Sequence, residues 1–132
     1  MTNYDVRLLV AFGEAVKGNE KVIKYFLDDG FPELAALAHA IRGSDDAFKW
    51  LLKKGYPHLA ALDSAIDNKE NAVAWLLKND YKAMVVFSEA CNNKPRALRW
   101  LAENKLDIFI HLAQIIYKLR QSRTFDYHKL HF

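Results

Sequence analysis

Disulfides, membrane spans and secretion signals are what this sequence most clearly lacks. With a single cysteine, Cys91, among 132 residues, the chain cannot form an internal disulfide framework. Nowhere do about 18 apolar residues run together, and the opening segment, which carries Asp5 and Arg7, has no signal-peptide cleavage pattern. We therefore expect a cytoplasmic protein that does not contact a membrane.

Catalytic and metal-binding motifs are also missing. The sequence has no glycine-rich phosphate loop, no His-Glu-x-x-His pair and no Cys-x-x-Cys. His128 and His131 are three residues apart, but two histidines make an incomplete metal site. We expect a protein that is not an enzyme, with no catalytic residues, no metal site and no cofactor.

What the sequence does contain is an internal repeat with a constant spacing of 25 residues. Four segments align without gaps, and they span residues 15–39, 40–64, 65–89 and 90–114. A fixed period of this length is typical of a solenoid, in which each unit buries its apolar face against its neighbours. Cys91 occupies a position that is isoleucine in two other repeats, which predicts a buried, unreactive thiol.

Two adjacent columns of the alignment contain large residues. The first column is Tyr25, Trp50, Trp75 and Trp100, and the second is Phe26, Leu51, Leu76 and Leu101. We expect both columns to be buried by packing, and Trp75→Ala then to cost about 3–5 kcal/mol through lost burial and a cavity.

Helix-start and helix-stop signals divide each repeat into two helices. Ser44 or Asp45 is suited to cap one helix, and Gly55 ends it, because glycine adopts the left-handed conformation readily. Pro57 then suits the first turn of the next helix, where no amide hydrogen is needed. The pattern predicts an all-α solenoid of stacked antiparallel helical hairpins with about nine helices.

The repeat also predicts the domain organisation. We expect a single repeat domain over residues 1–132, with a first helix over 5–17 and a last helix from Leu106 or Asp107 to about Gln121. The units are about 5–29, 30–54, 55–79 and 80–104, followed by a capping helix and tail at 105–132. At about 8–10 Å per layer, the stack would be roughly 40–50 Å long.

One repeat resembles the helical part of an ankyrin repeat. The matching residues are Leu37, Ala40, Gly43, Phe48, Leu51, Leu52 and Gly55. The period is 25 residues where ankyrin repeats have about 33, and the Thr-Pro-Leu-His opening is missing. Only Tyr56 and Pro57 separate Gly55 from the next helix, so there is no room for the projecting β-hairpin.

The resemblance implies that the concave face of the first helix of each unit is a recognition surface for a protein partner. The candidate contact residues on that face are His39, Asp63, Ser64 and Glu89. Ordinary solvated positions are the alternative interpretation of these residues. We expect a non-catalytic protein–protein interaction scaffold whose partner the sequence does not identify.

A nucleic-acid-associated protein is the alternative function. Residues 117–132 carry a net charge of +3, equal to that of the whole chain, so the rest is neutral. Further basic residues lie on the second helices, at Lys53, Lys54, Lys78, Arg96 and Arg99. Acidic residues are interspersed there, which favours a solvated helix face over a nucleic-acid surface.

The last helix has no following repeat to cover it. Ile115, Ile116 and Leu119 would face water, and the aromatic residues of the tail, among them Phe125 and Tyr127, could fold back over them. A second chain could cover the same surface by two-fold pairing. The sequence therefore predicts either a monomer or a homodimer formed through the C-terminal end.

Overall fold

The computed structural model describes the backbone of residues 4–130 and the side chains of residues 4–122. This part of the chain forms α-helices and no β-strand, so the predicted all-α fold is confirmed. The nine helices found there are α1 (Val6–Val16), α2 (Glu20–Asp28), α3 (Pro32–Ile41), α4 (Asp45–Lys53), α5 (Pro57–Ile66), α6 (Glu70–Lys78), α7 (Lys82–Ala90), α8 (Pro95–Glu103) and α9 (Asp107–Leu130).

Short turns with a left-handed residue separate the helices. At the end of α4, the amide of Tyr56 donates to the carbonyl of Leu51 at 2.8 Å, and Gly55 between them has a φ of 89°. This is the Schellman arrangement, which satisfies carbonyls that the helix itself leaves unpaired. Ser44 caps the start of α4 as predicted, since its side chain accepts a hydrogen bond from the amide of Ala47.

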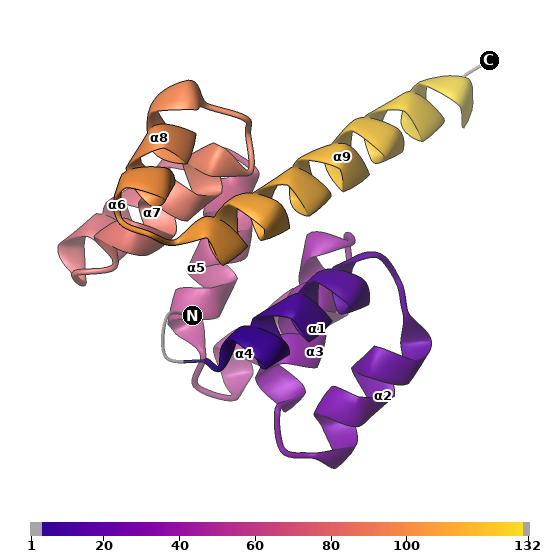
Figure 1. Cartoon of the computed structure of the whole chain (residues 1–132). Helices are drawn as coiled ribbons and strands as arrows, with labels where there is room; N and C mark the ends of the chain where they lie inside the picture. The colour runs from indigo at the N-terminus through magenta and orange to yellow at the C-terminus, as the bar shows by residue number, and fades with distance from the viewer. Residues whose placement is uncertain (1–3, 131–132) are drawn as a thin grey trace.

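The odd-numbered helices form an inner layer and the even-numbered helices an outer one. Each odd helix packs on the next odd helix, and each outer helix packs against the two inner helices that flank it in sequence. The inner layer is closed as well, because α1 packs against α9 (Figure 1). The five inner helices therefore surround a common core.

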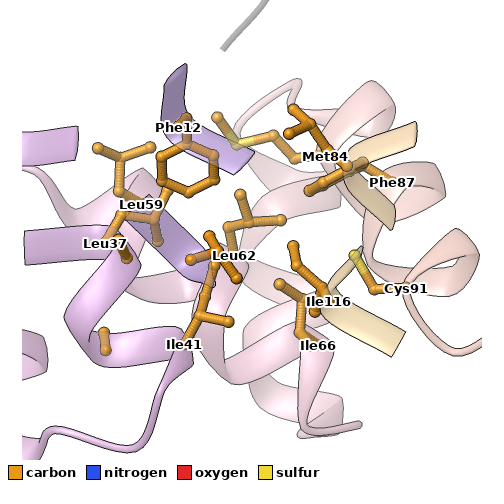
Figure 2. Packing of buried hydrophobic residues seen from close by; sticks show 14 of the residues in the cluster. Phe12, Leu37, Ile41, Leu59, Leu62, Ile66, Met84, Phe87, Cys91 and Ile116 are labelled. Carbon is orange, nitrogen blue, oxygen red and sulfur yellow. The ribbon is translucent and has the colours of Figure 1, made fainter. Parts of the chain in front are cut away.

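Three columns of the repeat fill this core. Residues at equivalent positions of all five inner helices are buried, and Figure 2 shows some of them converging from different helices. The columns are Leu9, Leu34, Leu59, Met84 and Phe109; Phe12, Leu37, Leu62, Phe87 and Leu112; and Val16, Ile41, Ile66, Cys91 and Ile116. Cys91 lies in an aliphatic position, as predicted.

Gly13 allows the first and last inner helices to approach closely. A Cβ atom at this position would lie 3.0 Å from Cδ1 of Ile115 and 3.1 Å from Cδ2 of Leu112, both on α9. Glycine is about 1 kcal/mol worse than alanine inside a helix, so its presence in α1 has a local cost. The close packing of α1 on α9 gives a physical reason for that cost.

The contact between α1 and α9 corrects the prediction of an elongated stack with an exposed last helix. Ile116 is fully buried, and Ile115 lies against Gly13, so α1 covers the surface that a folded-back tail or a second chain was expected to cover. The last helix also continues to Leu130 rather than ending near Gln121, and it projects beyond the other helices (Figure 1). Whether the protein is a monomer or a homodimer stays a prediction. The tail's aromatic side chains lie outside the described residues.

Contrary to expectation, the aromatic residues that form a column on the outer helices are not fully buried. Tyr25 and Trp75 are 45% and 36% exposed, and Trp50 and Trp100 are half-buried. The next column, with Phe26, Leu51, Leu76 and Leu101, holds the outer helices to the core, since all four side chains are fully or almost fully buried. Each partly exposed ring is thus followed in sequence by an anchoring residue, and the helix directs these two successive side chains to different sides.

Candidate interaction surface

Closure of the inner layer moves the available surface to the outside of the molecule. The inward faces of α1, α3, α5, α7 and α9 form the core, and successive outer helices make no substantial packing contact with one another in the described structure. We call the surface between successive outer helices the outer valleys. It comprises the outward side of α3 between α2 and α4, of α5 between α4 and α6, and of α7 between α6 and α8.

Leucines at equivalent positions of three outer helices are exposed. Leu27, Leu52 and Leu77 are 56%, 51% and 52% exposed, and we call them the leucine row. A single exposed leucine is ordinary on a protein surface. We interpret the recurrence of leucine in three successive repeats, where the fourth repeat has Ala102, as a candidate interaction surface. Sequence reasoning missed this row, although the leucines are visible in the alignment beside the buried column.

The four residues predicted as partner contacts lie on three different helices. His39 lies on α3 and is half-buried, Asp63 and Ser64 lie on α5 and are half-buried, and Glu89 lies on α7 and is exposed. The neighbouring residues Ala38 and Ser88 are buried. His39, Ser64 and Glu89 occupy equivalent positions of α3, α5 and α7, and Asp63 lies beside Ser64, so their role as partner contacts stays a prediction.

Glu89 lines a groove of about 520 Å³ formed by α5, α6 and α7. Its lining combines apolar side chains with carboxylates and amides, and we call the positions of the exposed Glu70 and Glu89 its rim. The apolar residues are Ala65, Val73, Ala74, Leu77 and Val85, and the polar residues are Asn68, Glu70, Ser88, Glu89 and Asn92. Leu77 of the leucine row therefore forms part of its wall.

Asn92 and Arg120 fix one end of this groove. Nδ2 of Asn92 donates to the carbonyls of Ile66 and Ser88, each at 3.0 Å. Nη1 of Arg120, on α9, donates to the Asn92 side chain at 2.8 Å and to the Ile66 carbonyl, and its Nη2 lies 3.2 Å from Oδ1 of Asp67. These bonds satisfy the C-terminal end of α5 and attach α9 to it.

The hydrogen bonds of Arg120 to the end of α5 were not predicted, because the basic residues of 117–132 were considered only for their net positive charge. A related interaction occurs two repeats before Asn92. Arg42 occupies the same column as Asn92, and its Nη1 donates to the carbonyl of Val16 at the end of α1, at 2.8 Å. Both side chains thus cap the inner helix of the preceding repeat.

Aromatic rings stack where α4 and α6 meet the helices that follow them. The rings of Trp50 and Tyr56 are nearly parallel with centroids 6.0 Å apart, and those of Trp75 and Tyr81 are arranged alike at 6.1 Å. His58 stacks on Tyr81 at 5.5 Å, and burial lowers the pKa of its imidazole. The faces of these rings therefore pack on one another.

A buried carboxylate lies near this aromatic cluster. Glu33 is only 7% exposed, and Tyr4 donates a hydrogen bond to its Oε1 at 3.2 Å. The negative charge of Glu33 raises the pKa of Tyr56, and burial together with Glu33 raises the pKa of Tyr4. Glu33 is therefore satisfied inside the fold and contributes to packing of the N-terminal segment.

Other features of reactive sites do not converge in the described residues. Burial raises the pKa of the Cys91 thiol far more than the charge of Arg120 lowers it, so the thiolate form is disfavoured. No group of three or more histidine, cysteine, aspartate or glutamate side chains within residues 4–122 is placed to hold a metal ion. No helix in the described part is long and apolar enough to cross a bilayer.

A second groove, of about 390 Å³, follows the seam between α1 and α9. Its lining residues are Lys17, His111, Gln114, Ile115, Lys118 and Leu119. Two lysines from opposite ends of the chain thus lie on one groove, which is a direct consequence of closure.

The fold and its surface define an all-α array of repeated helical hairpins with exposed outer valleys. Comparisons with protein-family models, with curated proteins and with solved structures find no match to this chain. The relation to ankyrin repeats thus stays a resemblance of sequence pattern.

Proposed function

We propose that this chain is an ankyrin-like helical-repeat protein that acts as a non-catalytic scaffold and binds another protein through its outer valleys. The observation that supports this function is the leucine row. Three large apolar side chains occupy repeat-equivalent positions at which about half of each side chain is exposed to solvent. Burying them against a partner removes apolar surface from water.

Rigid presentation is the mechanism. Each outer helix that carries a leucine of the row is anchored by the preceding side chain, such as Leu76 before Leu77, which is fully buried. The surface is therefore ordered before binding, and little conformational entropy is lost when a partner docks. We place the partner surface on the outer valleys because the inward faces of the inner helices are largely filled by the core.

The test is affinity capture from a lysate of the source cells with the purified chain as bait. The variant changes the leucine row to serine, at Leu27, Leu52 and Leu77. A matched control changes the adjacent exposed residues Asp28, Lys53 and Lys78 to serine. We expect a protein that is captured by the wild type and the control and lost by the leucine-row variant, with unchanged circular dichroism. Equal capture by all three proteins would refute the proposal.

The nucleic-acid alternative has weaker support. Arg120 is engaged by Asp67 and by the end of α5, so it does not belong to a free basic surface. Recovery of nucleic acid in place of protein in the same capture, with a steep dependence on salt, would favour that alternative.

A further inference from the structure

The groove between α6 and α7 differs from its repeat-equivalents in charge. The wall position occupied by Ala74 is basic in the other repeats, with Lys24, Lys49 and Arg99. Two rim positions are acidic here, at Glu70 and Glu89. At the positions equivalent to Glu70 and Glu89, the unit of α2 has Glu20 and His39, and the unit of α4 has Asp45 and Ser64. The unit of α8 has Pro95 and Gln114. Of these four sets of positions, only the one at α6 combines two carboxylates with no basic side chain.

Neither carboxylate is neutralised within the described structure. The ion pairs found among residues 4–122 involve other side chains, and Glu70 and Glu89 take part in none of them. Lys69 and Lys94 precede α6 and α8, but they do not line the groove. The rim therefore presents two negative charges that a ligand can pair.

The apolar part of the groove differs from its equivalents as well. Val73 stands where the other repeats have Ile23, Phe48 and Leu98, so the side chain at this wall position is smaller. Leu77 of α6, which is 52% exposed, and Val85 of α7, which is only 6% exposed, complete the apolar lining. A volume of about 520 Å³ lies within the roughly 300–1,000 Å³ typical of ligand pockets.

We propose that this groove binds a basic segment of the protein partner, in which a lysine or arginine is placed next to an apolar side chain. The cationic group lies between Glu70 and Glu89, and the apolar side chain packs on Val73, Leu77 and Val85. The proposal rests on the scaffold function above and names the chemistry of the partner. A basic residue supplied in trans then occupies the place that Lys24, Lys49 and Arg99 fill in the other repeats.

The charge pairing makes binding dependent on salt and on charge sign. Both carboxylates lie at a partly exposed rim, where mobile ions screen charges within about 8–10 Å. Pairing of this kind increases specificity and the association rate more than it increases affinity. An acidic segment of the same shape is rejected by like-charge repulsion.

The probe for the test is a synthetic, fluorescein-labelled helical peptide of leucine and lysine, with leucines at helical spacing on one face. Its control replaces every lysine with glutamate. Fluorescence anisotropy with the purified full chain measures both. We expect saturable binding of the lysine peptide that weakens with added salt, and no binding of the glutamate peptide. Absence of saturable binding by the lysine peptide, or equal binding of both peptides, would overturn the proposal.

Variants locate the binding to this groove. Ala74→Lys restores the basic residue of the other repeats and should weaken the lysine peptide about tenfold or more, as should the double variant Glu70→Gln with Glu89→Gln. A matched control, Glu20→Gln with Glu103→Gln, removes the same charge from exposed positions elsewhere and should leave binding within about twofold of the wild type. Equal weakening by the control means that only net charge matters, and this result contradicts the proposal.

The lysate capture separates this proposal from the scaffold function. If the Ala74→Lys variant keeps the partner that the leucine-row variant loses, the scaffold function stands and the groove assignment is wrong. If the Ala74→Lys variant also loses that partner while circular dichroism is unchanged, the groove is the basic-segment site.

Discussion

Eight turn residues in the described chain have a positive φ, and the first four of them are glycine. The later ones are Asn68, Asp80, Asn93 and Lys105. Asparagine and aspartate tolerate the left-handed region better than most residues, whereas lysine has no such advantage. The left-handed turn geometry is thus found in all eight turns, whereas glycine, the residue best suited to it, stands only in the first four.

Lys105→Gly should therefore stabilise the protein by about 0.5–1 kcal/mol, because φ at this position is 57°. Urea unfolding measures the change. Gly55→Ala is the reciprocal variant and should destabilise the protein. A Cβ atom there meets nothing within 4 Å, so its φ of 89° is the only cause. Loss of stability in Lys105→Gly would contradict this account of the turns.

Leu76 and Trp75 are adjacent on α6 and should respond differently to truncation. Leu76 is fully buried, so Leu76→Ala should cost about 2–5 kcal/mol. Trp75 is 36% exposed and stacks on Tyr81, so Trp75→Ala should cost less than Leu76→Ala, about 1–2 kcal/mol. Denaturant unfolding of the two variants gives the ranking, and the reverse order would mean that the tryptophan column is the true anchor.

Stability should fall as the pH drops below about 6.5, partly because of His58. Burial lowers the pKa of His58 from its ordinary value of 6.5, so below that pH the unfolded chain binds a proton more readily than the folded one. This contribution to stability is complete above pH 6.5 and is lost on acidification. His58→Ala, which introduces the residue found at the equivalent Ala83, should reduce the pH dependence of the melting temperature. An unchanged pH profile would assign the effect to other groups.

At the scale of elements, sequence reasoning identified most helix boundaries. The stop at Gly55, the cap at Ser44 and the start at Pro57 are local signals, and the structure contains all three. The end of α9 was misjudged because no glycine or proline follows Gln121 to mark it. Helix ends are therefore predicted well where a capping residue, a glycine or a proline marks them.

Removal of α9 tests how the elements depend on one another. A chain that ends at Leu106 should lose protection in α1 as well as in α7 and α8, because α1 packs against α9. Hydrogen exchange measured by mass spectrometry reports each helix separately. In an open array, removal of a terminal helix affects its sequence neighbours and leaves the distant end unchanged. Unchanged exchange in α1 would thus contradict closure.

At the scale of the whole molecule, the sequence predicted which helices are neighbours along the chain but not how sharply the array curves. A 25-residue period specifies the contacts between one unit and the next, whereas closure depends on a small angle added at every layer. Gly13 illustrates the difficulty, since its significance comes from Leu112 and Ile115 at the other end of the chain. The location of the binding surface stays a prediction, and it depends on the same curvature, because an inner face that is open in a gently curved array becomes the core in a closed one.

Chemical cross-linking between α1 and α9 tests closure most directly. Lys17 and Lys118 are exposed and line the same groove, whereas an open stack would hold α1 and α9 roughly 30–40 Å apart. A short amine-reactive cross-linker, applied to mixed light and isotopically heavy protein, should join Lys17 to Lys118 within one chain. Modification of both lysines without a link between them, or links found only between light and heavy chains, would show that the array is open and that the outer valleys are not its principal surface.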